Sequence, residues 1–389
     1  MTAMGQRGGV AVAAGSMLGA GAVVVFPAAV AETGWWSLVS LVMTAVVAAL
    51  TAVSFATLQA HSPSNGMYSQ VKGCLGEVPG RLAAVSGLAG RVVAGAAVAG
   101  AAGMLVLPGQ PLVAAVALIV LAAAWIFADT RVPVALCVVV MITLLLFVVV
   151  GLGISPEAPA VIRSGGVGSD DLTGLLSAAG LLLVGFVGFE RVRESSRAGL
   201  GVITAVAVVY LLVGFVALRH LGGPRLALSP TPLHDALVAA DAGALAPILT
   251  AGLVVGAVLA LRGLLDGACS IARDMADSGE LPQVVGHHRL VLVGAATAAT
   301  ALVLTPASAL GLASCLLLGS FAFVNSAARS LSKAQRSTWV CTGCCGLALC
   351  VVVAVNISVT ALAGAVGVLL VGAGLCAWVA RRARSVTAG

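Results

Sequence analysis

Residues 15–29 read GSMLGAGAVVVFPAA, and residues 185–190 read GFVGFE. Both motifs lie inside long apolar runs, and both place glycines two to four positions apart. Glycine in the interior of a helix destabilises it, because the backbone loses more conformational freedom on folding than at any other residue. The motifs fall in the first and the sixth apolar runs of the chain. This spacing favours two related halves, each of which begins with an interrupted helix.

The composition indicates that lipid surrounds most of the chain. Of the 389 residues, 60% are hydrophobic and 9% charged, and the mean hydropathy is +1.14. A soluble domain has roughly 25% charged residues, so this chain cannot cover itself with a polar surface in water. The apolar runs are continuous rather than alternating, which favours helices over a β-barrel. We expect an all-α membrane protein.

The apolar runs predict about twelve membrane-spanning helices. A bilayer-spanning helix needs about 20 apolar residues. An alternative count of ten or eleven merges the runs that meet at Pro306 or at Asn356. The expected spans are residues 10–31, 37–59, 82–107, 111–128, 132–153, 172–190, 200–220, 246–270, 290–305, 308–328, 338–356 and 358–380.

The positions of Lys and Arg predict the orientation in the membrane. With a cytoplasmic N-terminus, 15 of the 20 Lys and Arg residues fall on the cytoplasmic side, 3 outside and 2 within spans. Such a bias is typical of inner-membrane proteins, so we expect both termini in the cytoplasm. The net charge of +6 lies in short links between spans, which does not indicate nucleic-acid binding. The first run lacks a cleavage region and is interpreted as a retained span.

Paired interruptions of this kind are typical of secondary transporters. Many are built from two inverted repeats whose discontinuous helices form the substrate site near the middle of the bilayer. The interrupted backbone offers N–H groups to a carboxylate and C=O groups to an ammonium. We predict unwound backbone near Gly19 to Gly21 and near Gly185 to Gly188, with the two segments facing each other. The alternative is that these glycines only allow close helix packing.

Four motifs follow one another along most of the chain. Span 1 contains Gly15, Leu18, Gly19, Ala20, Gly21 and Pro27, and residues 62–76 after span 2 read SPSNGMYSQVKGCLG. Span 6 ends in GFE, and residues 270–282 after span 8 read SIARDMADSGELP. In this order the four motifs resemble those of the amino acid–polyamine–organocation (APC) superfamily of permeases.

The resemblance implies a fold and a function. Residues 10–153 and 172–328 would form five-helix inverted repeats, and residues 338–380 two additional helices. The expected function is secondary transport of an amino acid, or of a related amine or metabolite, across the cytoplasmic membrane, coupled to protons or running as exchange. The expected substrate site comprises Met17, Leu18, Gly19, Ala20, Gly21, Arg91, Val184, Gly185, Phe186, Val187 and Gly188.

Four ionisable residues within or at the ends of spans are further candidates. Glu190 and Asp266 are the candidates for proton coupling, and the alternative for Glu190 is a helix-end charge paired with Arg191 or Arg193. Asp266 lies four residues after Arg262, so the two share a helix face and can form a structural ion pair.

Arg91 is an unusual cation for the interior of a span. It lies about 15 Å deeper than Arg81, at 1.5 Å per residue. A charge at that depth needs a partner or water, and three partners are possible: Asp266, Glu190 or an acidic group of the substrate. An internal salt bridge is one interpretation, and selection of anionic substrates is the other, unless Arg91 lies near the cytoplasmic surface.

Departures from the family pattern keep a second function open. Val184 stands where many relatives have an aromatic residue that closes over the substrate, the stretch after Glu190 is short, and span 5 has no Lys. A membrane protein that kept the fold without transport, such as a sensor or partner subunit, is the alternative. The chain has no P-loop, so we do not expect it to use ATP by itself. We expect no enzyme, catalytic residue, metal site or cofactor, since the spans contain no Ser/His or Asp/Asp pair and no His-rich set, and Cys341, Cys344 and Cys345 have no nearby His.

Overall fold

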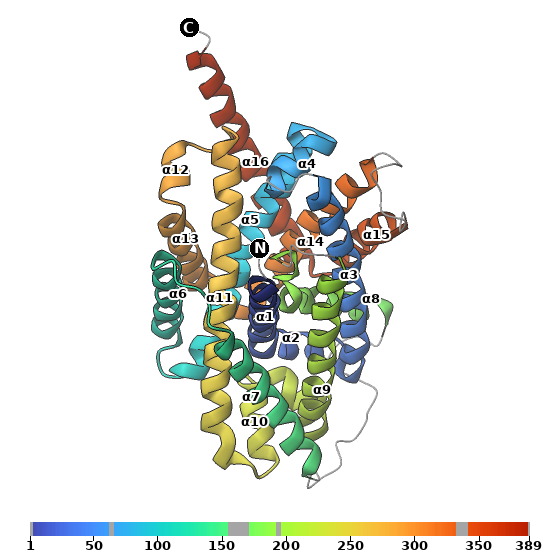
Figure 1. Cartoon of the computed structure of the whole chain (residues 1–389). Coiled ribbons are helices and arrows are strands. Elements are labelled where there is room, and N and C mark those ends of the chain that lie inside the picture. The colour runs from blue at the N-terminus through green and yellow to red at the C-terminus, as the bar shows by residue number, and fades with distance from the viewer. Residues whose placement is uncertain (1–2, 62–65, 155–170, 192–195, 332–340, 388–389) are drawn as a thin grey trace.

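The computed structural model describes residues 3–61, 66–154, 171–191, 196–331 and 341–387. Every regular element in these ranges is helical, and none is a β-strand. The prediction of an all-α membrane protein is confirmed. The longer helices run roughly along one axis of the molecule, and α16 projects from one end of the bundle (Figure 1).

Each of the expected spans coincides with a helix. Among the described residues, seven stretches are long and apolar enough to cross a membrane, and the first, Val10–His61, contains two expected spans. Four shorter apolar helices account for the remaining runs. The spans are formed by α1 (Ala3–Ala20) with α2 (Phe26–Thr33), α3 (Ser37–His61), α5 (Glu77–Val106), α6 (Pro111–Phe127), α7 (Val134–Gly153), α8 (Leu172–Leu182), α9 (Ser196–Leu228), α11 (Ala246–Asp277), α13 (Arg289–Val303), α14 (Pro306–Ser330), α15 (Cys341–Val355) and α16 (Val359–Thr387).

Short helices fill the links between the spans. They are α4 (Met67–Leu75), α10 (Pro232–Ala239) and α12 (Gln283–His287), with 3-10 turns at Gly34–Trp36 and Gly243–Leu245. Helices α4 and α12 lie at the end from which α16 projects, and α10 lies at the opposite end (Figure 1). The links therefore alternate between the two ends of the bundle, as a multi-pass membrane protein requires.

Side chains cap the first turns of two of the spanning helices. The side chain of Asp171 accepts a hydrogen bond of 3.0 Å from the backbone N–H of Gly174 at the start of α8. The Thr305 side chain accepts in the same way from Ser308 N–H at the start of α14, where Pro306 follows the cap. Such caps satisfy N–H groups that the helix leaves without partners, and proline suits the first helical turn because its missing N–H is not needed there.

Helix α5 lies in the core of the bundle. It packs against α14, α11, α6 and α13, and most of its residues from 83 to 103 are buried alanines and glycines. Small side chains let neighbouring helices approach closely, which is how membrane helices gain packing energy without a hydrophobic driving force. Helix α5 therefore forms a closely packed wall that also contacts residues 21–25 of span 1.

Span 1 keeps its helical backbone through the glycines, so the predicted unwinding at Gly19 to Gly21 is wrong. Helix α1 is interrupted instead by a π-helical turn, Gly21–Val25, whose flanking residues have ordinary helical dihedral angles. Pro27 follows this turn and has no N–H to donate to the carbonyl four residues before it. Widening the helix by one residue per turn accommodates that lost bond without unwinding the chain.

Span 6 is broken where the sequence predicts it. Helix α8 gives way to a 3-10 turn, Leu183–Phe186, and then to extended backbone at Val187 with φ −65° and ψ 126°. Gly188 has a φ of +129°, which only glycine adopts without strain. A second 3-10 turn, Phe189–Arg191, completes the described part of the span.

Candidate functional site

The two interruptions lie against each other. A Cβ atom built on Gly185 would lie 3.1 Å from the Cα atom of Gly21, so the two backbones touch with no side chain between them. The π turn of span 1 also packs against the 3-10 turn of span 6. Segments separated by more than 160 positions in the sequence thus form one compact junction.

The junction is lined by buried apolar side chains. The expected lining residues that carry side chains here are exposed by 4% or less: Met17, Leu18, Ala20, Val184, Phe186 and Val187. The two interrupted segments therefore contribute polarity to the junction mainly through backbone groups. In this structure the junction is closed and tightly packed.

Tyr210 of α9 inserts its phenol into the junction, and sequence reasoning missed it. Its hydroxyl donates to the carbonyls of Met17 in span 1 and of Gly185 in span 6, the latter at 3.1 Å. A Cβ on Gly21 would overlap the phenol oxygen, so glycine is required there for Tyr210 to reach in. A signal was available, because a tyrosine in the middle of an apolar span must find a partner for its hydroxyl.

Aromatic rings hold the phenol in place. The ring of Tyr210 makes edge-to-face contacts with Phe26 at 5.8 Å and with Phe186 at 5.6 Å between centroids. Such pairs add about 0.5–1.5 kcal/mol each beyond the burial of their area. Span 6 thus contributes an aromatic ring to the junction at Phe186, two residues after Val184, where the family pattern places one.

Arg91 is paired with Glu190 at the broken end of span 6. The Arg91 Nη2 atom lies 2.6 Å from Glu190 Oε1, and the two side chains are 4% and 14% exposed. Arg91 Nη1 donates to the Gly87 carbonyl at 3.0 Å, and Gly188 N–H donates to Glu190 Oε2 at 2.9 Å. Of the three partners considered for Arg91, this structure shows Glu190.

The pair ties the broken backbone of span 6 to helix α5. Gly188 has the one positive φ of the break, and its N–H is held by the same carboxylate that meets Arg91. Arg193 and the Arg191 side chain, the partners expected for Glu190 as a helix-end charge, lie outside the described part of the chain. The carboxylate thus joins the Arg91 guanidinium to Gly188 N–H at the point where the chain changes direction.

Arg262 lies at the side of the bundle rather than at the junction. Its Nη2 atom donates to the Thr130 carbonyl at 3.1 Å, and its guanidinium lies 5.4 Å from the ring centroid of Trp125. This is a cation–π geometry between α11 and the end of α6. The pairing of Arg262 with Asp266, and a role for Asp266 in coupling, stay predictions.

The motif segments at the α4 end of the bundle bind each other through a buried ionic cluster. Tyr68 donates to Glu280 Oε1 at 2.6 Å, and Arg81 Nε lies 2.5 Å from Glu280 Oε2. Asp274 accepts from the Ser69 N–H at 3.1 Å and from its hydroxyl at 2.5 Å. These contacts fasten α4 to the end of α11, so the described part of the first motif segment, residues 66–76, meets residues 270–282.

Ionisation of Tyr68 is expected to lower stability at alkaline pH. Burial raises the pKa of the Tyr68 phenol, and its hydrogen bond to Glu280 raises the pKa further. Above the ordinary tyrosine pKa of about 10, the unfolded chain releases this proton and the folded one retains it. Stability from this group is therefore present below pH about 10 and falls as pH rises, by up to about 1.4 kcal/mol per pH unit.

The measurement is the unfolding midpoint of the wild type and of Tyr68→Phe in the same detergent, from pH about 9 to about 11. The variant keeps the ring and loses the ionisable hydroxyl, so its stability should fall less steeply. Equal slopes for the two proteins would contradict this role of Tyr68.

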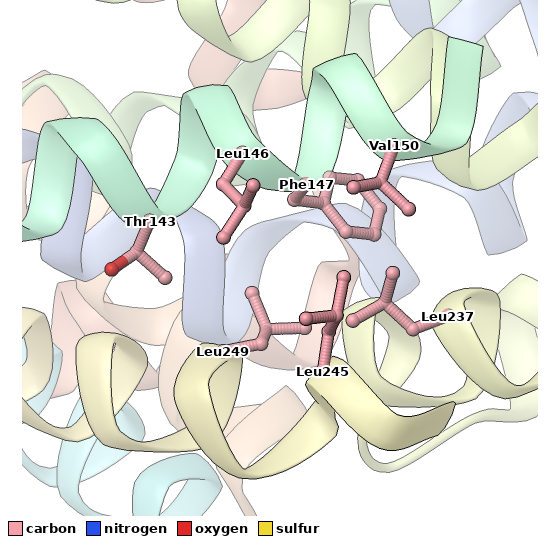
Figure 2. A pocket seen from close by; sticks show the side chains of 7 residues that line it. All are labelled: Thr143, Leu146, Phe147, Val150, Leu237, Leu245 and Leu249. Carbon is pink, nitrogen blue, oxygen red and sulfur yellow. The ribbon is translucent and has the colours of Figure 1, made fainter. Parts of the chain in front are cut away.

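Two hollows lie away from the junction. Figure 2 shows a cavity whose seven side chains converge from α7 on one side and from α10, α11 and the turn between them on the other. Its volume is about 10 Å³, room for one water molecule. A wider hollow of about 750 Å³ is lined by Leu75, Pro79, Phe323, Ser326, Arg329, Ser330 and Cys344. Neither hollow includes a residue of the two interruptions.

Comparison with known proteins points to transport. The chain is 31% identical over 420 residues to an uncharacterized transporter of Mycobacterium tuberculosis and to one of Mycobacterium bovis, covering 99% of this chain and 94% of each relative. A crystal structure of a manganese transporter mutant from Eremococcus coleocola has the same fold. Its TM-score is 0.52 at 13% identity, over 98% of this chain and 96% of that one. No protein-family model matches the chain.

Proposed function

The chain belongs to the same family as these mycobacterial transporters, and from this premise we propose that it is a secondary transporter of an amino acid or a related amine. It is a multi-pass membrane transport protein rather than an enzyme. Transport relatives along the whole chain argue against a sensor or subunit that lost transport. We propose further that it is an APC-type permease, on the four sequence motifs.

The observation that carries the proposal is the junction of the two interruptions. Carbonyls of Met17 and Gly185, from the two halves of the chain, converge on one point and accept hydrogen bonds from a single hydroxyl. A substrate ammonium carries three donors and suits such an acceptor pair. The apolar lining suits an aliphatic side chain, so a neutral amino acid or small amine is the proposed substrate class.

The charge of Arg91 supports a neutral rather than an acidic substrate. The Arg91 guanidinium is already paired with Glu190, whose Oε1 atom lies 2.6 Å from Nη2. An anionic substrate would first have to displace this carboxylate, which Gly188 N–H also holds. The internal salt bridge is therefore the proposed role of Arg91. Selection of anionic substrates remains the competing role, and the Arg91 variant described in the Discussion separates the two.

Inverted repeats are supported by corresponding contacts in the two halves. Helix α3, the second span of the first half, packs on α8, the first span of the second. Helix α9, the second span of the second half, packs in turn on α2 of the first span. We propose residues 10–153 and 172–328 as the repeats, with both termini in the cytoplasm. Alternating access would then move one half against the other around the junction.

Manganese transport by the structural neighbour is not carried over to this chain. Likeness at 13% identity concerns the fold. A hard divalent cation prefers carboxylate, carbonyl and water oxygens, whereas the carboxylate beside this junction, Glu190, is held by Arg91 and by Gly188 N–H. Manganese nevertheless belongs among the tested substrates, since two of the junction's acceptors are carbonyls.

The test is substrate flux in vesicles. Purified protein is reconstituted into liposomes, and uptake is measured for neutral, acidic and basic amino acids, small amines and Mn²⁺, with protein-free liposomes as the control. Saturable uptake of neutral amino acids or amines is the expected result. Saturable uptake of Mn²⁺ alone would replace the proposed substrate class, and no protein-dependent uptake of any compound would count against transport.

Glu190→Gln is expected to flatten the pH dependence of flux. The carboxylate can take up a proton and thereby release Arg91 and Gly188 N–H, whereas the amide has no proton to exchange in this range. Flux should be measured over pH about 5 to 8 for the wild type and the variant. Asp266→Asn is the matched control, because Asp266 is the other coupling candidate. If the pH profile of flux is flattened in Asp266→Asn and unchanged in Glu190→Gln, Asp266 of α11 is the coupling residue and Glu190 is not.

A further inference from the structure

Tyr210 occupies the position that the proposed function assigns to a ligand. Its side chain is fully buried, it comes from α9 rather than from either interruption, and its hydroxyl meets both the Met17 and the Gly185 carbonyl. The junction is closed around this side chain. The acceptor pair is therefore filled from within the protein.

A hydroxyl is an incomplete partner for two carbonyls. It has one proton to donate, so Met17 and Gly185 must share that proton. A buried carbonyl without a full donor costs free energy. An ammonium group offers three donors and a positive charge, so it would satisfy both carbonyls at once. On chemistry alone, an amine is the better occupant of this point.

The space around the phenol also fits such an exchange. The phenol oxygen fills the space that a Cβ atom on Gly21 would take, and the rings of Phe26 and Phe186 lie 5.8 and 5.6 Å from that of Tyr210 in edge-to-face pairs. If the phenol swings out, these two rings line a space of about the size of a tyrosine side chain. Aromatic rings stabilise a cation placed over their faces, and they also pack well against an aliphatic group.

We propose that Tyr210 is a built-in occupant of the substrate site, which the ammonium group of the substrate displaces from the Met17 and Gly185 carbonyls. This rests on the proposed function for the identity of the displacing group. In the empty transporter the phenol holds spans 1 and 6 together. Its displacement by substrate frees α9 from the junction, which ties binding to a movement of that helix.

Tyr210→Phe tests the exchange. The variant keeps the ring and removes the competing hydroxyl, so the Met17 and Gly185 carbonyls lose the hydrogen bond from Tyr210. Binding of neutral amino acids, of small amines and of their uncharged amide analogues is measured by ligand-induced shifts of the thermal midpoint at neutral pH. The expected result is about tenfold tighter binding of the amines by Tyr210→Phe than by the wild type, the size of one neutral hydrogen bond.

Tyr68→Phe is the matched control, because it removes the other tyrosine hydroxyl of the chain far from the junction, and it should bind like the wild type. Equal or weaker amine binding by Tyr210→Phe would overturn the inference. Tighter binding of the uncharged amides to the same extent would overturn the role of the ammonium.

A second variant separates this inference from the proposed substrate class. Tyr210→Ala leaves a space that p-cresol, the tyrosine side-chain analogue, should fill, raising the thermal midpoint more than toluene, which lacks the hydroxyl. If no amine binds any variant and p-cresol still outperforms toluene, the occupant role stands and the amine substrate is wrong. If the two compounds act alike, the occupant role is wrong, whatever the substrate proves to be.

Discussion

Arg91→Ala is expected to lower the free energy of unfolding by about 3–5 kcal/mol, the cost of breaking a buried ion pair by removing one partner, and to abolish flux. The Glu190 side chain, which is 14% exposed, would lose the guanidinium that lies 2.6 Å from it. The broken end of span 6 would lose its tie to α5. Unfolding in detergent and uptake in vesicles measure the two effects.

The matched control is the double variant Arg91→Met with Glu190→Gln. It removes both charges and keeps similar volumes, so it should regain most of the lost stability. Comparing neutral with acidic amino acids in the Arg91→Ala vesicles then separates the two roles of Arg91. Equal loss indicates a structural bridge, and selective loss of the acidic substrate indicates recognition. A single variant as stable as the wild type would contradict the importance of the pair.

Gly19→Ala is expected to have a comparable effect on folding. A Cβ at position 19 would overlap the backbone carbonyl of Gly256 on α11, and backbone cannot rotate away as a side chain can. Helices α1 and α11 would have to separate, which also moves Met17 and Gly21. We expect a loss on the order of 3 kcal/mol, seen as a lower thermal midpoint and a lower yield of folded protein.

Gly201→Ala provides the comparison for the same chemical change. Gly201 lies within α9, and a Cβ there meets no atom within 4 Å. Alanine is the better helix former by up to about 1 kcal/mol, so this variant should be neutral or slightly more stable. If Gly19→Ala and Gly201→Ala behaved alike, the close crossing of α1 and α11 would not be a determinant of stability.

The sequence predicts the number and order of the spans because membrane spanning depends mainly on length and apolarity. It also predicts the break at Val187 and Gly188. In span 1 the same glycine signal leads to a wrong prediction, because a π turn and unwound backbone are alternative responses to a proline such as Pro27. The choice between a π turn and unwound backbone depends on the packing of the neighbouring helices, which the local sequence does not show.

The contacts of the candidate site were harder to predict than its location. Arg91 and Glu190 are 99 positions apart, and local pattern leaves three partners for Arg91 because side-chain reach depends on how the helices pack. Tyr210 reaches Met17 across 193 positions. Its burial in the middle of α9 is visible in the sequence as a polar group in an apolar span, yet the sequence does not identify the carbonyls it meets.

The π turn at Gly21–Val25 divides span 1 into two helices, α1 and α2, whose side chains point in different directions around the common axis. One added residue rotates everything beyond it by about 100°, since an α-helix turns once in 3.6 residues. Before the turn, α1 packs mainly on α11 and α7 and also contacts α9, and after it α2 packs on α9 and α8. A single pass through the bilayer therefore contributes to two different walls of the bundle. A helical wheel drawn continuously through residues 10–31 would therefore misplace Phe26 by about 100° around the helix axis.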